Sequence, residues 1–343
     1  MPARQLDLTR QSYKAQALAS RFSLRIVGQT EATSALSGIL EKFQSGFYDK
    51  TKPIASLLFL GPTGVGKTGV AEAFAEGLFG DAKRMLKVDC AEFQHSHEIA
   101  KLVGSPPGYL GHRETHPFFT NESVKKYQSA ELPFTILLFD EIEKSSDALW
   151  NLLLGILDKG TLTTGTNEIV DLTSTIIIMT SNVGSSELAN ENAIGFNSGI
   201  KVTSDAQMKE IALGAARRKF APEFLNRLDQ IVMFKTLTPM DLDAILRLEL
   251  DKLWDRIALR ASVQFEFDVS PAGWRQLLKE GYDRRYNARN LKRTVEKYVA
   301  LPLGRLVSTG QVMQGDSLII DYDGAWKYYA EKQHASGTAS ASL

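Results

Sequence analysis

The sequence contains one cysteine, Cys90, and no apolar run that approaches the roughly 20 residues of a membrane-spanning helix. A single cysteine excludes a disulfide within the chain and fits the reducing cytoplasm. Residues 1–10 carry charges and no apolar core, so no secretory signal is predicted. Net charge is also absent, because 40 basic residues balance 40 acidic ones. We therefore expect a soluble, cytoplasmic protein with no electrostatic bias towards nucleic acid or membranes.

One glycine-rich stretch has the pattern of a phosphate-binding loop, G-x-x-x-x-G-K-[ST]. An apolar run at 56–60 precedes it and predicts a buried strand, and apolar residues at helical spacing follow it over 69–79. The glycines let the backbone turn tightly and aim its N–H groups inward. Lys67 is predicted to reach the β- and γ-phosphates of ATP, and Thr68 to ligate Mg²⁺. The predicted nucleotide-binding residues are Gly61, Pro62, Thr63, Gly64, Val65, Gly66, Lys67 and Thr68.

Two carboxylates end a second apolar run, because Asp140 and Glu141 directly follow Ile-Leu-Leu-Phe at 136–139. Beside a phosphate loop, Asp140 is predicted to hold Mg²⁺ through water, and Glu141 to polarise the water that attacks the γ-phosphate. Asn182 ends the next buried strand, and its amide could reach between the γ-phosphate and that water. Asparagine at a strand end is also a common turn former, so both interpretations stay open.

Two arginines could complete the site. Arg227 follows a predicted helix and precedes the last strand of the first domain. If it projects from the edge of the protein, it could act as an arginine finger in a neighbouring subunit. Arg289 opens a helix of the smaller domain, from which it could sense the γ-phosphate across the domain cleft. A surface salt bridge is the alternative for both.

A second distinctive stretch spans 104–111, where two prolines and the flanking glycines present Tyr109 and Leu110 as an apolar tip. Such a tip can grip an extended polypeptide by packing, without recognising its side chains. The alternative is a turn whose tyrosine packs on its own domain.

Strands that alternate with helices predict an α/β fold with a parallel sheet covered on both faces. Thr238-Pro239 starts a helix and marks a boundary, because threonine caps and proline opens helices. The predicted organisation is an N-terminal helical extension docked through Leu18 and Phe22 at 1–25, an α/β core at 26–236, a small α+β domain at 237–325 and a disordered tail at 326–343.

Together these motifs resemble the Clp-type AAA+ ATPases, most closely their second ATPase module, over residues 22–321. The resemblance implies a P-loop AAA+ core with a small lid domain, assembled as a hexamer with ATP sites between subunits. It assigns Val27 to the adenine site, 61–68 to Walker A, 136–141 to Walker B, Asn182 to sensor 1, Arg227 to the arginine finger, Arg289 to sensor 2, Tyr109 to the pore loop and 160–168 to a secondary pore loop.

The same resemblance gives Ile194-Gly195-Phe196 a role as a docking tripeptide for a ClpP-type peptidase, the alternative being a loop tip that tucks into its own domain. Three departures stand out. Asn287 replaces the usual sensor 2 glycine, and Asn tolerates left-handed backbone. Glu114-Thr115-His116-Pro117 replaces a glycine-rich segment and should be stiffer. The sequence has one ATPase module and no recognisable substrate-binding or coiled-coil middle domain, so we do not expect a stand-alone disaggregase.

The expected function is an ATP-dependent unfoldase that threads unfolded or aggregated proteins through a hexameric pore. One alternative is a nucleic-acid motor or loader on the same core, favoured by local basic runs such as 217–219. The aromatic pore tip argues against it, and so does the use of these arginines at ATP sites and domain seams. Another is a nucleotide-gated scaffold, against which the complete set of predicted catalytic residues argues.

Overall fold

The computed structural model describes residues 6–7, 9–105, 116–185, 187, 205–261, 263–283 and 287–332. The chain divides into two units, Met1–Thr236 and Leu237–Leu343. Tyr109, Leu110 and the tripeptide 194–196 lie outside the described residues. In the described part of the chain, no helix is both long and apolar enough to cross a membrane.

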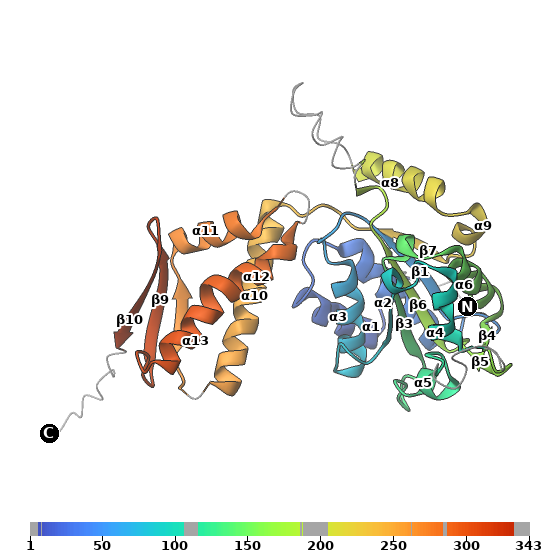
Figure 1. Ribbon diagram of the computed structural model, residues 1–343, viewed down its shortest axis with the longest axis horizontal. Coiled ribbons are helices and arrows are strands. Elements are labelled where there is room, and N and C mark those ends of the chain that lie inside the picture. The colour runs from blue at the N-terminus through green and yellow to red at the C-terminus, as the bar shows by residue number, and fades with distance from the viewer. Residues whose placement is uncertain are drawn as a thin grey trace. The chain divides into compact units, whose positions relative to one another are not determined.

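A parallel five-stranded sheet forms the centre of the first unit (Figure 1). Its order is β2-β3-β6-β1-β7, and every neighbouring pair runs parallel. The central strands β1, β3 and β6 are almost wholly buried, which explains their continuous apolar sequences. The predicted parallel α/β core is confirmed. The strands are β1 Ala55–Leu60, β2 Leu86–Asp89, β3 Thr135–Asp140, β6 Thr175–Ser181 and β7 Gln230–Met233.

Helices of the first unit precede and connect these strands. They are α1 Tyr13–Ser23, α2 Thr30–Ser45, α3 Lys67–Phe79, α4 Ala100–Val103, α5 Asn121–Lys125, α6 Asp147–Lys159, α8 Asp205–Lys219 and α9 Pro222–Leu225, with 3₁₀ turns η1 Cys90–Glu92, η2 Ser96–Ile99 and η3 Ile142–Lys144. The segment 96–103 is divided between the 3₁₀ turn η2 and the short helix α4. Cys90 is buried, and burial raises the pKa of its thiol.

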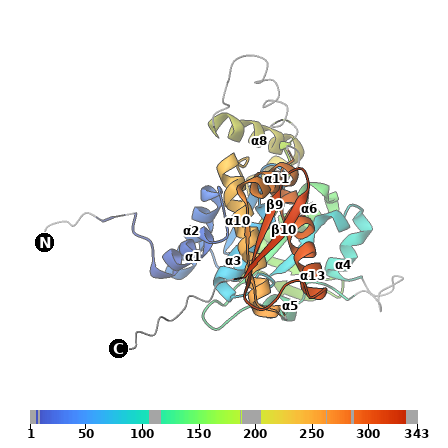
Figure 2. The same ribbon diagram turned by 90° about the vertical axis from the view of Figure 1, so that its left-hand side faces the viewer.

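The N-terminal segment is helical over only part of the predicted 1–25. Helix α1 begins at Tyr13 because the Ser12 hydroxyl accepts the Ala15 N–H at 3.2 Å, which caps the helix. It packs against α2 and α3, and α1 and α2 lie side by side in both views (Figures 1 and 2). Leu18 and Phe22 are buried as predicted, and the Phe22 ring stacks on Phe74.

The glycine- and threonine-rich segment after α6 forms a hairpin. Strands β4 Thr161–Thr163 and β5 Ile169–Asp171 pair antiparallel and make a separate two-stranded sheet. Gly160 takes a φ of 59° between α6 and β4, where a Cβ would stand 2.6 Å from Thr173 Cγ2. The turn therefore requires glycine.

The second unit combines helices with a three-stranded sheet of order β10-β9-β8. Its first helix starts as predicted, because Thr238 and Asp241 form a reciprocal capping box. Its first strand, β8, begins at Glu266. The elements are α10 Pro239–Arg260, β8 Glu266–Val269, α11 Pro271–Gly281, η4 Ala288–Asn290, α12 Leu291–Val295, a π-helical turn η5 Glu296–Ala300, α13 Leu301–Ser308, β9 Asp316–Tyr322 and β10 Trp326–Lys332.

The prediction of a disordered tail over 326–343 is wrong for residues 326–332, which form β10 antiparallel to β9. This strand also supplies a hydrogen bond to a helical carbonyl group. Pro302 lacks the N–H that a regular α-helix would direct to the Tyr298 carbonyl. The Tyr328 hydroxyl of β10 donates to that carbonyl instead, at 2.9 Å. Residues 333–343 lie outside the described part of the chain.

Candidate functional site

The phosphate loop joins the carboxyl end of β1 to the amino end of α3. Gly61, Gly64 and Gly66 have φ values of 152°, 78° and 102°, which residues with a Cβ rarely adopt. A Cβ on Gly61 would stand 2.6 Å from the Phe234 carbonyl oxygen, so this glycine also allows close packing on the segment after β7. The predicted strand-turn-helix geometry is present, and the start of α3 supplies N–H groups for an anion.

Lys67 is buried, with 6% of its surface exposed. Its amino group donates to the carbonyls of Gly61 and Pro62 at 2.7 and 2.8 Å, and to Asn182 Oδ1 at 2.8 Å. Burial lowers the pKa of Lys67 to about 8, although the carboxylates of Glu143, Asp140 and Glu141 oppose that shift. The charge of this lysine is thus poorly compensated, and a phosphate would compensate it.

Asp140 lies where the carboxyl end of β3 meets the phosphate loop. Its Oδ1 accepts the hydroxyl of Thr68 at 2.9 Å and the hydroxyl of Thr180 at 2.5 Å. Lys87 pairs with Oδ2 at 3.4 Å. Thr180 also accepts the backbone N–H of Glu141 at 3.0 Å, and so links the Asp140 carboxylate to the backbone of Glu141. No role at the site was predicted from the sequence for Thr180 or Lys87.

Thr68 and Asp140 are the predicted Mg²⁺ residues, and their oxygens converge in the structure. Hard oxygen donors suit Mg²⁺, which keeps waters and takes phosphate oxygens as ligands. Within the described ranges, no three His, Cys, Asp or Glu side chains form a group that could hold a metal ion alone. The residues present therefore fit Mg²⁺ bound together with a nucleotide.

Glu141 adopts a left-handed backbone, with φ 58°, directly after β3. Its Oε1 accepts the side-chain amide of Asn182 at 3.2 Å, and Lys144 pairs with its Oε2. Hydrogen bonding to Glu141 raises the pKa of Lys144. Asn182 thus bridges Lys67 and Glu141, which unites three predicted site residues from three elements.

Glu143 is a further acidic residue at this site that the sequence did not single out. Its Oε1 accepts the backbone N–H of Asn182 at 3.1 Å. Its other oxygen is buried and, in the part of the chain that the structure describes, has no hydrogen-bond partner. The available signal was the segment 140–143, Asp-Glu-Ile-Glu, which has three carboxylates in four residues.

Gln29 ties the segment before α2 to the phosphate loop. Its amide donates to the carbonyls of Lys235 and Val65 at 3.0 and 3.4 Å and accepts the Lys235 N–H at 3.1 Å. Val27, predicted for the adenine site, is partly exposed beside it.

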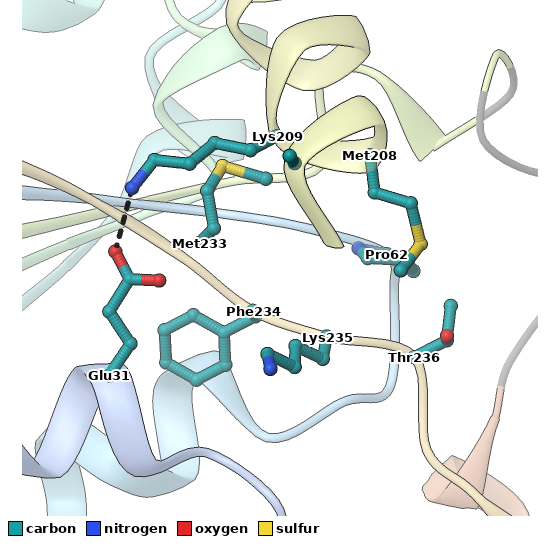
Figure 3. A pocket seen from close by; sticks show the side chains of 9 residues that line it. Glu31, Pro62, Met208, Lys209, Met233, Phe234, Lys235 and Thr236 are labelled. Carbon is teal, nitrogen blue, oxygen red and sulfur yellow. Dashed lines mark hydrogen bonds and ion pairs between the residues drawn. The ribbon is translucent and has the colours of Figure 1, made fainter. Parts of the chain in front are cut away.

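An apolar cavity of about 200 Å³ lies next to Pro62 of the phosphate loop. Met208, Met233 and Phe234 supply its apolar walls, and a 3.3 Å ion pair between Lys209 and Glu31 crosses its rim (Figure 3). Val27 does not line this cavity.

Arg227 lies far from the phosphate loop of its own unit. The Ser56 hydroxyl, at the amino end of β1, donates to the Arg227 carbonyl at 3.4 Å. The loop begins at the other end of that strand, five residues on, or roughly 16 Å at the usual rise. The Arg227 side chain instead pairs with Asp158 at 2.7 Å.

Arg289 is exposed on η4 of the second unit. Two residues before it, Asn287 has a φ of 48°. Asparagine adopts a positive φ more readily than most residues with a side chain, and was therefore expected to be tolerated in place of glycine here. Of the other predicted site residues, Thr63 and Val65 belong to the phosphate loop, whereas Tyr109, Leu110, Ile194, Gly195 and Phe196 lie outside the described residues.

A parallel sheet of this order, with a phosphate loop after β1 and an acidic end on β3, defines a P-loop nucleotide triphosphatase. The family model "AAA domain (Cdc48 subfamily)" matches residues 52–231. The model "C-terminal, D2-small domain, of ClpB protein" matches residues 237–320. The chain belongs to the Clp-type AAA+ ATPases and corresponds to their D2-type module.

Curated relatives include the ATP-dependent Clp protease ATP-binding subunit ClpC of Staphylococcus aureus (strain USA300), which is 36% identical over 332 residues. That match covers 97% of this chain and 39% of the relative. The negative regulator of genetic competence ClpC/MecB of Bacillus subtilis (strain 168) is 37% identical over 87% of this chain and 36% of the relative. The chain thus spans about two fifths of the length of these relatives.

A solved structure described as "Closed State CryoEM Reconstruction of Hsp104:ATPyS and FITC casein" matches with a TM-score of 0.77 at 29% identity. The match covers 92% of this chain and 52% of that chain. The AAA+ fold class, ATPase class and Clp-type family expected from the motifs are confirmed.

Proposed function

We propose that this chain hydrolyses ATP at the seams of a hexamer and uses the energy to thread unfolded or aggregated polypeptides through a central pore. Arg227 is the observation that carries the proposal. Its backbone contacts the amino end of β1, and the phosphate loop follows the carboxyl end. An arginine placed there cannot serve its own nucleotide, but it can serve that of a neighbour.

Each predicted site residue has a role in this proposal. Lys67 binds the phosphates, Thr68 and Asp140 hold Mg²⁺, and Asn182 orients the attacking water. Bound Mg²⁺ would neutralise phosphate charge. Glu141 accepts a proton from the water as its oxygen bonds to the γ-phosphorus, and the bond from that phosphorus to the ADP oxygen breaks, so that ADP and phosphate result. Glu141 must leave Lys144 to do this.

The cavity beside Pro62 supports the nucleotide assignment, because it offers apolar surface next to the phosphate loop. Arg289 is proposed to sense the γ-phosphate from the smaller domain. Val27 is proposed to contact adenine from outside this cavity, because it does not line it.

The threading part of the proposal places Tyr109 and Leu110 in a pore loop, and the β4–β5 hairpin in a secondary pore loop. Tyr109→Ala should keep basal ATPase activity and lose unfolding. The name of the ClpC relatives, an ATP-binding subunit of a protease, supports a ClpP-type peptidase as partner through Ile194, Gly195 and Phe196. A cytoplasmic location completes the proposal, as the single cysteine favours.

Mixing two inactive variants tests the seam. Glu141→Gln subunits keep their arginine finger but lose their own hydrolysis. Arg227→Ala subunits keep a complete site of their own but lose the finger. If Arg227 acts in trans, co-assembly restores turnover, because a Glu141→Gln subunit offers its finger to an Arg227→Ala site. If turnover stays at the sum of the separate variants, the seam proposal is wrong. Stimulation by DNA rather than by casein would favour the nucleic-acid motor.

A further inference from the structure

The Arg227 guanidinium is held by one acidic residue that the proposed chemistry leaves unused. Arg227 Nε and Asp158 Oδ1 are 2.7 Å apart. The pair engages Nε, which is one of five N–H donors in the planar fork of a guanidinium. Contact at Nε fixes the direction of the fork and leaves its terminal amino groups for a second anion. The side chains are 31% and 42% exposed, so the pair stands at the surface where a neighbour can approach.

The backbone around Arg227 is fixed independently of Asp158. Asp229 accepts both the N–H and the hydroxyl of Ser56 at 2.8 Å, and the Asp229 N–H donates back to that hydroxyl at 3.1 Å. Lys42 pairs with the same carboxylate at 3.4 Å. The chain at Arg227 is therefore anchored to β1, and Asp158 acts on the direction of the side chain alone.

Asp158 belongs to the last turn of α6, three residues before β4 begins. The Gly160 N–H donates to Ile156 in α6 at 2.8 Å, and the Gly160 carbonyl accepts the N–H of Leu172 at 2.8 Å, just past β5. Both ends of the hairpin thus meet at the end of α6. A displacement of the hairpin would move Asp158 with it, because no flexible linker separates them.

The hairpin is attached, at its tip and along β5, to both chain segments that flank residues 106–115. On one flank, the Gly165 N–H donates to the Val103 carbonyl at 2.7 Å, and a Cβ on Gly165 would stand 2.6 Å from the carbonyl oxygen of Gly104. On the other flank, Asn121 donates to the Ile169 carbonyl and accepts the Asp171 N–H, both at 3.0 Å. One hydrogen-bonded body therefore extends from these flanks to Asp158.

We propose that Asp158 is the positioning residue of the Arg227 finger, and that the β4–β5 hairpin transmits movement of the flanks of 106–115 to the finger through this ion pair. The inference rests on the proposed action of Arg227 in trans. It adds a physical link by which polypeptide held in the pore would change hydrolysis at the adjacent seam. Movement of the hairpin would displace Asp158, and the ion pair would then reorient the Arg227 guanidinium.

The subunit-mixing assay tests the first half of the proposal, because it separates a subunit's finger from its own ATP site. As finger donors to Arg227→Ala sites, Glu141→Gln subunits that also carry Asp158→Asn should restore at least tenfold less turnover than Glu141→Gln alone. In the reverse arrangement, Asp158→Asn subunits with an intact Glu141 are the acceptor, and Glu141→Gln subunits provide the finger. Turnover at the Asp158→Asn sites should then be normal. Asp158→Glu should recover part of the donor function. Asp147→Asn, on the first turn of the same helix, is the matched control and should donate normally.

The outcomes distinguish the two levels of the proposal. If Glu141→Gln subunits that carry Asp158→Asn restore full turnover, the proposed role of Asp158 is wrong, and the seam proposal stands. Equal loss of turnover when Asp158→Asn subunits are the acceptor would also contradict that role, because it would indicate a general effect on folding. Failure of the reference mixture of Glu141→Gln with Arg227→Ala contradicts the seam proposal, and this inference with it.

A second pair of variants tests the hairpin. Gly165→Ala should push the hairpin away from Gly104 and lower the ratio of the casein-stimulated to the basal ATPase rate severalfold. Gly155→Ala in α6 is the control, because its Cβ would meet nothing within 4 Å. Equal stimulation in both variants would refute transmission through the hairpin.

Discussion

The protonation state of Lys67 gives a quantitative test of the phosphate site. Burial lowers its pKa from 10.5 to about 8 in the nucleotide-free protein. At about 1.4 kcal/mol per unit, the charged form is disfavoured by about 3 kcal/mol relative to a lysine in water. Phosphates placed at the amino group should restore that energy, because they pair the buried charge.

Nucleotide binding should therefore take up a proton at alkaline pH. At about pH 9, roughly nine in ten nucleotide-free sites hold a neutral Lys67, so ATP affinity should be about tenfold weaker than at about pH 7, with almost one proton taken up per ATP bound. The phosphates of ATP are already fully ionised at that pH. Below about pH 7, Lys67 is charged in both states and contributes no further change in affinity.

The assay is calorimetric titration of Glu141→Gln with Mg-ATP at about pH 9, in buffers of different ionisation enthalpy. Any binding that Lys67→Arg retains should not weaken between about pH 7 and 9, because arginine stays charged. Equal affinity at both pH values, with no proton uptake, would refute the description of Lys67 as a buried and poorly compensated charge.

The same shift affects stability, with a sign that can be checked. A lysine whose pKa is lower in the folded state binds fewer protons there than in the unfolded chain between about pH 8 and 10.5. The contribution of Lys67 to the free energy of unfolding therefore rises with pH across this window. Below it, the full cost of about 3 kcal/mol is present, and ATP should remove most of it.

Three further predictions concern chemistry and packing. Glu141→Gln should bind ATP but hydrolyse it about 10²–10⁴-fold more slowly in a coupled-enzyme assay, and near-normal turnover would remove Glu141 from its role as base. Tyr328→Phe should lower the free energy of unfolding by about 1 kcal/mol in urea, since the Tyr298 carbonyl loses its donor, whereas the half-exposed Tyr329→Phe should be neutral. Phe22→Ala should cost about 3–5 kcal/mol by the same measurement, against less than about 0.5 kcal/mol for Tyr13→Ala on the same helix, and equal effects would show that α1 does not dock through Phe22.

The parts of the fold that follow from local sequence were predictable. The phosphate loop specifies its own turn through glycines at positive φ, and β1, β3 and β6 are continuous apolar runs because both faces of the sheet are covered. The start of α10 was also predictable, because Thr238 and Asp241 cap each other within one turn.

Contacts between distant segments were not predictable in the same way. Thr180 reaches Asp140, and Glu143 reaches the backbone of Asn182, only because β3 and β6 are neighbours in a definite register. The pairing of Arg227 with Asp158 likewise depends on how α6 passes the end of β1. No short motif specifies these contacts.

The sequence contains a turn signal before strand β10, but the Ala- and Ser-rich composition of the residues after the strand obscured it. Asp323-Gly324 lies between Tyr322 and a run that begins at Trp326, and Asp-Gly between aromatic-rich runs is a strong hairpin signal. The turn is a three-residue loop, 323–325, between the paired Tyr322 and Trp326, and Gly324 has a φ of 104° within it. The Ala- and Ser-rich residues that follow, 333–343, led to the wrong assignment of the whole stretch as disordered.

Electron cryomicroscopy of Glu141→Gln with Mg-ATP and casein tests the central claim most directly. The account predicts a ring of six subunits, with the Arg227 guanidinium of each at the γ-phosphate bound to the next and with polypeptide density in the channel. Particles that stay monomeric with ATP bound, or a ring in which Arg227 contacts no nucleotide, would contradict it.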